Sequence, residues 1–578
     1  MKLSLSWIKD FVNIPEDMDM KQLAYDLTMD TVEVEDVEYL ADRFDHMVVG
    51  VIEDIEPHPN ADKLRVCKVD IGDGEIKDIV CGGINLEKGM RVAVSCPGAI
   101  VRWHGEGKPV EIKKSKLRGV ASYGMICASD EIGLGDLFPA SQEAEILDLS
   151  AFDVPAGTTL ADALDLNDVL LEIDNKSMTN RPDLWGHYGI AREIAALYNL
   201  PLAKIEPFRA DVQSDFKVEI EDPDRCTRYI GVEMSGVAVK PAPYKMQNRI
   251  WKVGMRPINA LVDITNYVML ATGNPTHAFD ADNITDHIVV RHAGEGEKLL
   301  LLNDKELELN ADDLVITDSE GAVALAGVMG GAKDSILPKT ERVILEVANF
   351  EATGIRRTAL RYDTRTEASS RYEKAIDPER CDQALALSMK YFKELYPELQ
   401  VTGYCDNYVK KLDRAEIDVN LTWLEKRLGK HLTNEEIQGK LEQLGFDVQI
   451  DGDNMHVTAP TWRSTGDISI KDDVMEEVAR MYGYDNFEAT EFTTTFTDSI
   501  NQKDKSLVRN IKEYLAIRCG MQEVYTYPWM NDVFVNAVLQ STDGVLKLST
   551  PPAPDMSCIR SSLLPNLCEA VAKKRALL

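Results

Sequence analysis

The sequence lacks paired cysteines and long apolar runs, and each absence excludes a class of protein. Its ten cysteines show no CxxC pair and no zinc-site spacing, so they indicate reduced core residues rather than a disulfide or zinc scaffold. No stretch approaches the roughly 20 apolar residues that would span a bilayer. The opening residues, MKLSLSWIKDF, do not have the pattern of a signal peptide. We therefore expect a cytoplasmic protein that makes no membrane contact.

Positive charge is also scarce. The chain has 64 Lys and Arg residues against 97 Asp and Glu residues, a formal net charge of −33. The surface as a whole repels phosphate, so any contact with nucleic acid must come from local basic patches. Apolar residues make up 44% of the 578 residues and only 24 are proline, which is typical of a folded protein. A chain of this length predicts about three to five domains.

The patterning along the chain predicts a multidomain α+β protein. Short alternating strands with Gly, Asn and Asp turns over residues 47–130 predict a small barrel of the OB type. Mixed strands and helices over residues 210–400 predict a pair of α+β domains. Residues 408–485 contain helices and a two-stranded wing that resemble a winged helix. A Thr-rich linker follows, and then a helix, a strand and a final helical stretch, CEAVAKKRALL.

One dense basic run lies within the predicted barrel. Lys113, Lys114, Lys116 and Arg118 are enough to neutralise about three or four phosphates. Judged by charge alone, a solvated loop is the more frequent explanation of such a run. The flanking segments EPHPNADKLRVCKVDIGDG, IVCGG, VAVSCPGA and EIGLG, however, resemble the tRNA-binding OB module of synthetase-associated proteins. That resemblance favours binding of nucleic acid.

A second group of residues is polar but mostly uncharged. The block DITNYVMLATGNPTHAFD places Thr265, Asn266 and His277 near an Asn-Pro turn, and the later AGVMGG offers free backbone donors. Together these groups predict a polar pocket. Taken singly, His277 is more often a core histidine, and Gly-rich runs are more often tight turns.

A third group is acidic. Asp473, Glu476 and Glu477 stand at i, i+3 and i+4 and so share one helical face, and Asp467 precedes them in a turn. Like charges on one face repel, and an all-oxygen ligand set favours a hard cation such as Mg²⁺. The alternative is a solvated first turn that the helix dipole stabilises.

The longer motifs of the chain resemble one family. MKLSLSWIKDFV, DNKSMTNRPDLWGHYGIAREIAAL, RPINALVDITNYVMLATGNPTHAFDAD and RTEASSRYEKAIDP occur in the order found in bacterial-type phenylalanyl-tRNA synthetase beta subunits. The similarity covers nearly the whole chain. It implies a chain cut short at its C-terminus, without the anticodon-binding domain.

The resemblance implies a division into five parts. These are an N-terminal α/β domain (1–39 plus 153–200), an OB-fold tRNA-binding domain inserted into it (40–152), an editing domain pair (205–400), a winged-helix-like magnesium-binding domain (408–485) and the start of a noncatalytic class II synthetase-like domain (490–578).

The resemblance also implies roles for individual residues. An editing pocket that hydrolyses mischarged tyrosyl-tRNA is implied, in which Glu346 reads the tyrosine hydroxyl and Gly327 and Gly330 shape the wall. A second site of this kind is needed because an apolar pocket for phenylalanine cannot strongly reject an added hydroxyl. The implied residues are Thr265, Asn266, His277, Gly327, Gly330 and Glu346 for the pocket, Asp467, Asp473, Glu476 and Glu477 for Mg²⁺, and Lys113, Lys114, Lys116, Arg118 and Arg256 for tRNA.

The family further implies an assembly of two alpha and two beta chains. The alpha subunit uses ATP to attach phenylalanine to its tRNA, and this chain has no ATP site of its own. The competing hypothesis is a nonenzymatic nucleic-acid-binding protein built on the OB and winged-helix-like segments.

One more basic cluster lies after Glu346 and comprises Arg356, Arg357, Arg361, Arg365 and Arg371. It has two explanations, which are guidance of the tRNA acceptor end and ion pairing with acidic neighbours.

Overall fold

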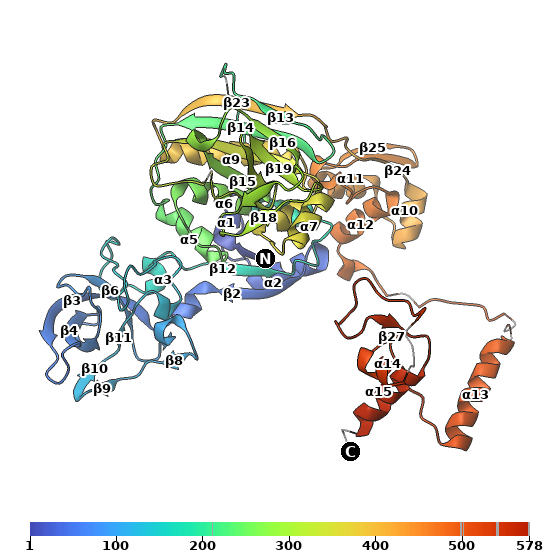
Figure 1. Ribbon diagram of the computed structural model, residues 1–578, viewed down its shortest axis with the longest axis horizontal. Helices are drawn as coiled ribbons and strands as arrows, with labels where there is room; N and C mark the ends of the chain where they lie inside the picture. Colours follow the sequence, from blue (N-terminus) through green and yellow to red (C-terminus); the bar gives the residue numbers. More distant parts are fainter. Residues whose placement is uncertain are drawn as a thin grey trace. The chain divides into compact units, whose positions relative to one another are not determined.

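The computed structural model describes residues 1–210, 212–333, 335–489, 491–497, 500, 502–538 and 543–575. The chain divides into two compact units, Met1–Glu488 and Ala489–Leu578, and each is described by itself (Figure 1). None of the helices in the described ranges is long and apolar enough for a membrane crossing.

The first unit begins with a three-stranded sheet in the order β1 (Lys2–Ser4), β12 (Val169–Ile173), β2 (Val34–Tyr39). Because β12 pairs with both β1 and β2, the chain leaves this sheet after β2 and returns to it at β12. The accompanying helices are α1 (Leu5–Ile8), α2 (Met20–Asp30) and α4 (His187–Leu197).

The residues between β2 and β12 form a nearly closed barrel. Its five-stranded sheet has the order β11-β6-β3-β4-β5, and the edge strands β11 and β5 are in contact. The barrel strands confirm the predicted run of short strands. They are β3 (Met47–Pro57), β4 (Arg65–Asp70), β5 (Ile76–Cys81), β6 (Arg91–Ser95) and β11 (Met125–Ile126), with the hairpins β7 (Ile100–Val101) to β8 (Val110–Glu111) and β9 (Ser115–Leu117) to β10 (Val120–Ser122), and the short helix α3 (Leu160–Ala163).

Two further sheets lie face to face in the middle of the first unit. The four-stranded sheet has the order β15 (Thr276–Asp280), β22 (Arg342–Phe350), β14 (Cys226–Ser235), β23 (Gln400–Tyr408), and all its pairs are antiparallel. The five-stranded sheet has the order β13 (Val218–Ile220), β16 (Ile288–His292), β19 (Leu314–Asp318), β20 (Gly321–Leu325), β21 (Met329–Gly330). The remaining elements are the pair β17 (Lys298–Leu300) and β18 (Glu306–Glu308) and the helices α5 (Tyr244–Lys252), α6 (Ala260–Thr272), α7 (Ala352–Arg361), α8 (Glu367–Tyr372) and α9 (Arg380–Leu395).

Strand alternation assigns the two faces of the four-stranded sheet to two cores. Val343, Leu345 and Val347 belong to the core that includes residues of α6 and α9. Ile344 and Ala348, one position out of phase, belong to the core shared with the five-stranded sheet. Successive side chains of a strand point to opposite faces. Glu346 therefore points toward the five-stranded sheet.

Residues 416–482 form three helices on a three-stranded sheet in the order β24 (Glu416–Asn420), β26 (Asn454–Thr458), β25 (Asp447–Asp451). The β25–β26 hairpin confirms the strand pair predicted in this segment. The helices are α10 (Leu421–Leu428), α11 (Asn434–Gln443) and α12 (Lys471–Tyr482). Thr433 begins α11 with a reciprocal capping box to Glu436, which satisfies backbone donors at the helix start.

The second unit has a small core. Its elements are α13 (Lys503–Cys519), β27 (Trp529–Met530), α14 (Asp532–Val538), β28 (Cys558–Ile559) and α15 (Leu564–Arg575). Its buried apolar cluster consists of Met530, Val535 and Cys558. The helix predicted before residue 520 is confirmed as α13. The strand predicted after it is confirmed only at Trp529–Met530, and the final residues 576–578 lie outside the described residues.

Candidate functional site

His277 and Glu346 meet across paired strands. β15 and β22 run antiparallel with His277 directly opposite Glu346. Phe279, two residues beyond His277, is buried in the core shared with the five-stranded sheet, so His277 faces that side as well. A cavity of about 70 Å³ lies there, which we call the His277–Glu346 cavity. It is lined by Pro275, Thr276, His277, Ile316, Ala324, Leu325, Gly327, Val328, Met329, Gly330, Glu346, Ala368 and Tyr372.

Glu346 is buried and His277 is half-buried, and both side chains are mostly uncharged near pH 7. Burial raises the pKa of Glu346 to about 8, although a hydrogen bond from Tyr229 opposes the rise. Burial also lowers the pKa of His277 to about 4. A neutral carboxylic acid and a neutral imidazole can both accept and donate hydrogen bonds. The cavity can therefore bind a hydroxyl group without burying a net charge.

Gly327 and Gly330 bring backbone close to these side chains. The φ angle of Gly327 is +66°, and a Cβ there would lie 3.0 Å from atoms of Ile355, Phe350 and Tyr372. A Cβ at Gly330 would lie 2.9 Å from the His277 ring. Glycine is thus required at both positions to keep the wall of the cavity where it is.

Thr265 and Asn266 are not brought into the wall of the cavity. Both belong to α6, where the Thr265 hydroxyl donates to the carbonyl of Val262 at 2.7 Å. The hydroxyl of Thr276 donates to the Thr265 carbonyl at 3.2 Å, which ties α6 to the start of β15. Neither residue is among the described residues that line the cavity.

Tyr229 is a residue of this site that the sequence alone did not predict. Its hydroxyl donates to Glu346 Oε2 at 3.2 Å, from the adjacent strand β14. Aromatic residues are common in strands, so Tyr229 alone carried no signal. Tyr229 and Glu346 are 117 residues apart in the sequence. Only the register between their two strands brings them together.

The four predicted magnesium ligands all line one hollow of about 260 Å³, which we call the carboxylate hollow. Two of them are already paired. Asp467 accepts from Arg463, and Glu477 accepts from Arg463 at 2.8 Å and from Arg480 at 2.6 Å. Burial alone would raise the pKa of Glu477, but the two guanidinium groups outweigh burial and hold it well below the usual range.

The other two ligands are less engaged with cations. Asp473 accepts from the backbone amides of Ser469 at 2.7 Å and Ile470 at 2.9 Å, and so caps α12. Glu476 is exposed at the rim. Within the described ranges no group of three or more His, Cys, Asp or Glu side chains has the arrangement of a metal site. The four carboxylates offer only oxygen ligands, which suit a hard cation, but Arg463 already contacts two of them.

The predicted basic run is an exposed turn on the barrel. Lys116 lies on β9, and Arg118, with φ of +45°, makes the turn into β10. Lys113 pairs with Glu111 at 3.1 Å, and Lys114 lies 4.9 Å from the ring centre of Tyr123. Lys113 also lines a cavity of about 890 Å³ beside the barrel, together with the exposed Trp103.

Three of the other predicted basic residues form ion pairs within the described part of the chain. Arg361 pairs with Asp313, Arg365 with Glu373 at 2.6 Å, and Arg371 with Glu367 at 2.6 Å. Ion pairing is therefore confirmed for these three. Arg356 and Arg357 are exposed on α7, and Arg256 is exposed between α5 and α6.

Four domain families match consecutive parts of the chain. A putative tRNA binding domain matches residues 47–158, and a B3/4 domain matches residues 225–397. A tRNA synthetase B5 domain matches residues 417–484, and the phenylalanyl tRNA synthetase beta chain CLM domain matches residues 488–576. The His277–Glu346 cavity thus lies within the B3/4 match, and the carboxylate hollow includes residues of the B5 match.

Whole proteins match along nearly all of the chain. The phenylalanine–tRNA ligase beta subunit of Oceanobacillus iheyensis is 36% identical over 581 residues, which cover 98% of this chain and 70% of that protein. The corresponding subunit of Pectobacterium atrosepticum is 36% identical over 579 residues, with 99% and 70% covered. That of Clostridium acetobutylicum is 35% identical over 590 residues, with 99% and 72% covered.

Proposed function

The chain belongs to the phenylalanine–tRNA ligase beta-subunit family, and from this premise we propose that the His277–Glu346 cavity hydrolyses tyrosyl-tRNA made in error. The observation that carries the proposal is the pairing of His277 with Glu346 beside the loop Gly327–Gly330, within the B3/4 match. An editing role also fits the B3/4 domain family.

Recognition of tyrosine rests on Glu346. Its carboxyl group is buried and has one described side-chain partner, the Tyr229 hydroxyl at 3.2 Å. A tyrosyl hydroxyl would supply a second partner, whereas a phenylalanyl ring would leave the remaining oxygen unpaired. A buried polar group left unpaired costs about 1–3 kcal/mol. Tyrosyl esters are therefore retained and phenylalanyl esters are released.

Hydrolysis needs support for the developing oxyanion and space for the substrate. The backbone amide of Val328 already donates to the Leu325 carbonyl at 3.0 Å. The other amides of Gly327–Gly330 are the proposed donors, because preorganised amides stabilise such charge without reorganising. The cavity of about 70 Å³ is small beside the roughly 300 Å³ or more of common ligand pockets. We propose that Met329, a flexible side chain in its wall, moves aside when the substrate binds.

The direct test is deacylation of tyrosyl-tRNA specific for phenylalanine by this chain assembled with its alpha subunit. We expect hydrolysis well above the buffer rate, and little hydrolysis of the phenylalanyl ester. Binding of tRNA without turnover would instead support the nonenzymatic nucleic-acid-binding alternative.

Substitution of Gly330 should impair this reaction without unfolding the domain. In Gly330→Ala the new Cβ would lie 2.9 Å from the His277 ring, so the ring must shift. Overpacking of this kind costs about 1–3 kcal/mol, and a cost of this size in the transition state lowers the deacylation kcat by about 5- to 160-fold. Gly439→Ala in α11 is the control, because a Cβ there meets no atom within 4 Å. An unchanged kcat in Gly330→Ala would contradict the role of this wall.

We further propose that the chain works with an alpha subunit in an assembly of two alpha and two beta chains, and that ATP and Mg²⁺-dependent synthesis takes place on alpha. The helix α13 supports a partner surface, because it has no buried residue in the described part of the chain. Its apolar side chains Leu507, Ile511 and Leu515, spaced by four residues, are 58%, 49% and 38% exposed. Native mass spectrometry of the co-expressed subunits would measure the stoichiometry.

We propose an OB-fold at 40–152 inserted between 1–39 and 153–200, an editing pair at 205–400, a winged-helix-like domain at 408–485 and part of a noncatalytic class II synthetase-like domain at 490–578. Contact with tRNA is proposed for the exposed side chains Lys113, Lys114, Lys116, Arg118 and Arg256.

For the carboxylate hollow we propose Mg²⁺ binding through Asp467, Asp473, Glu476 and Glu477. The oxygen-only donor set supports this proposal. Because Arg463 contacts two of the four carboxylates, Asp473 and Glu476 are the ligands most available to the ion.

Removing these two charges should abolish the effect of magnesium on stability. A ligand that binds only the folded state stabilises it, by about 2.7 kcal/mol at 100 times its Kd. We expect Mg²⁺ to raise the unfolding midpoint of the wild-type chain, and chelation to reverse this. The double variant Asp473→Asn, Glu476→Gln should not respond. Asp472→Asn, which removes a neighbouring carboxylate that does not line the hollow, should respond like wild type. Equal responses in all three proteins would refute the ligand assignment.

A further inference from the structure

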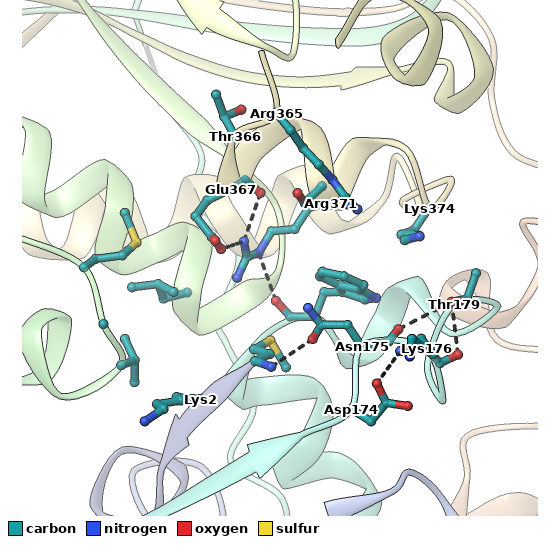
Figure 2. Close-up of a pocket in the computed structure, with 17 residues that line it drawn as sticks. Lys2, Asp174, Asn175, Lys176, Thr179, Arg365, Thr366, Glu367, Arg371 and Lys374 are labelled. Atoms are coloured by element: carbon teal, nitrogen blue, oxygen red, sulfur yellow. Dashed lines mark hydrogen bonds and ion pairs between the residues drawn. The ribbon is translucent and has the colours of Figure 1, made fainter. Parts of the chain in front are cut away.

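A second, larger cavity lies on the other side of α8 from the His277–Glu346 cavity. Its volume is about 750 Å³, within the size range of small-molecule and cofactor sites. Figure 2 shows Arg365, Arg371 and Lys374 on one side of it and Asn175 and Lys176 on the facing side. We call it the α8 cavity. It is lined by Met1, Lys2, Asp174, Asn175, Lys176, Thr179, Trp185, Val253, Gly254, Met255, Leu270, Arg365, Thr366, Glu367, Ser370, Arg371 and Lys374.

The lining of the α8 cavity is basic on a chain that is otherwise acidic. Its cationic side chains are Lys2, Lys176, Arg365, Arg371 and Lys374, whereas its carboxylates are Asp174 and Glu367 alone among the described lining residues. The formal charge of the whole chain is −33. A concave surface with a local excess of positive charge focuses the field and attracts an anion.

Arg371 is buried and paired with Glu367 at 2.6 Å, but the other four cations are incompletely neutralised. Arg365 and Lys374 share the single carboxylate of Glu373, at 2.6 Å and 3.2 Å. Lys2 has its nearest carboxylates at 3.7 Å and 3.9 Å. Lys176 forms no ion pair with any residue of the described ranges and is exposed. Lys176 is therefore available to an anionic ligand without breaking an ion pair of the described ranges, whereas Arg365 would share its guanidinium between the ligand and Glu373.

The cavity also has an apolar wall and hydroxyl groups. Trp185 lies under the ammonium of Lys374, 5.6 Å from the ring centre, and Val253, Met255 and Leu270 continue this wall. Thr179 and Ser370 add hydroxyl groups. Positive side chains beside aromatic and apolar surface are the combination that binds phosphate together with a base or ribose.

The helix α8 belongs to both cavities. Ala368 and Tyr372 line the His277–Glu346 cavity, whereas Glu367, Ser370 and Arg371 line the α8 cavity. Residues four apart share one face of a helix, so the two sets lie on different faces. The preceding Thr366 connects the cavities directly, because its hydroxyl donates at 2.8 Å to the carbonyl of Val328 in the wall of the first.

We propose that the α8 cavity is a nucleotide subsite, which holds a phosphate and its nucleoside from the single-stranded acceptor end of tRNA while the terminal ester occupies the His277–Glu346 cavity. The inference rests on the proposed function and adds the site that positions its RNA substrate. Lys176 and Arg365 are the phosphate-binding side chains, and the wall of Trp185, Val253 and Met255 contacts the base or ribose. The exposed Arg256, which follows Met255, extends the positive surface away from the cavity.

The test compares Lys176→Ala and Arg365→Ala with the control Lys339→Ala, an exposed lysine outside both cavities. The first probe is an RNA minihelix that ends in single-stranded CCA, bound to the assembled enzyme and measured by fluorescence anisotropy over a range of salt. For each cavity variant we expect a Kd about fivefold higher, and a slope of log Kd against log salt that is smaller by about 0.7, which is one phosphate contact on a single strand. The control should match wild type.

Deacylation of tyrosyl-tRNA gives an independent measurement. We expect KM to rise in both cavity variants while kcat stays within about twofold, because the reacting atoms are in the other cavity. If wild type deacylates but both variants keep the wild-type KM, Kd and salt slope, the subsite is refuted and the proposed function stands. If wild type does not deacylate, the proposed function fails, and the minihelix measurements alone decide the subsite.

Cytidine 5′-monophosphate is the second probe. It distinguishes a subsite for the tRNA acceptor end from a site for free nucleotides. We expect it to bind only at millimolar concentration and to compete with the minihelix. Micromolar binding of the mononucleotide, lost in Lys176→Ala while minihelix binding is unchanged, would overturn the proposal in favour of a site for free nucleotides.

Discussion

Replacing Glu346 by alanine is expected to lower the preference for tyrosyl over phenylalanyl ester by about thirtyfold or more, because a site built to bind a hydroxyl group discriminates through its buried polar groups. Without the carboxyl group, the tyrosyl hydroxyl enters the cavity unpaired, and the phenylalanyl ring no longer leaves a carboxyl group unpaired. Both changes reduce the preference for the tyrosyl ester. The measurement is kcat/KM for deacylation of the two aminoacyl-tRNAs by the assembled enzyme.

Two further variants sharpen this experiment. Glu341→Ala removes an exposed carboxylate just before the same strand and should leave the preference unchanged. Glu346→Gln resembles the neutral acid that burial favours at pH 7, so it should retain more of the preference than Glu346→Ala. A Glu346→Ala enzyme that still prefers the tyrosyl ester as strongly as wild type would show that another group reads the hydroxyl.

The raised pKa of Glu346 also has a consequence for stability. Burial raises the pKa from its usual value near 4.5 to about 8, so folding favours the protonated form. The contribution of this group to stability is therefore complete below pH 4.5 and is lost as the pH rises through about 8. Between pH 6 and 9 we expect the thermal midpoint of Glu346→Gln to fall less than that of wild type.

Replacing Arg463 by methionine is expected to destabilise the first unit by about 3–5 kcal/mol, because breaking a buried ion pair leaves carboxylates without their partner. Arg463 is 3% exposed and contacts both Asp467 and Glu477. Arg480 continues the network to Glu193 on α4 at 2.8 Å, so the ion pairs join α12 to the N-terminal part of the chain. The loss can be measured by hydrogen exchange of α12 amides during a urea titration.

An exposed arginine provides the comparison. Arg427 pairs with Asp472 at 3.1 Å, with side chains 57% and 39% exposed. Surface pairs of this kind contribute about 0–1 kcal/mol, so Arg427→Met should stay within that range. Equal effects of the two substitutions would show that the buried network does not hold α12. Because Glu477 has a lowered pKa, its contribution should be present above pH 4.5 and should be lost as the pH falls further.

Local patterns were sufficient to predict most of the elements. The strands predicted within residues 210–400 are found as β14, β16 and β22, and the helices predicted within residues 408–485 include α10 and α11. The prediction was weaker after residue 520, where only Trp529–Met530 pairs as a strand. A β pattern becomes a strand only when a partner strand is present, and β28 offers two residues.

At the carboxylate hollow, the helical spacing predicted which acidic side chains lie together but not which side chains they contact. The spacing of Asp473, Glu476 and Glu477 correctly predicted that they line one surface. It did not predict that Arg463 would reach Glu477, because Arg463 lies in a different segment and meets α12 only in the folded chain. Repulsion among carboxylates is thus relieved at least partly by arginine.

The sequence by itself determined the family, the order of the parts and the positions of His277, Glu346 and the glycines, because these are properties of motifs that lie within short segments. Only the tertiary structure decided which groups meet. Strand register placed His277 opposite Glu346 and brought Tyr229 to the same carboxyl group. The packing of α8 between two cavities left Arg365 and Lys374 with one carboxylate between them. Pairings of this kind depend on contacts between distant segments, whose geometry no local pattern encodes.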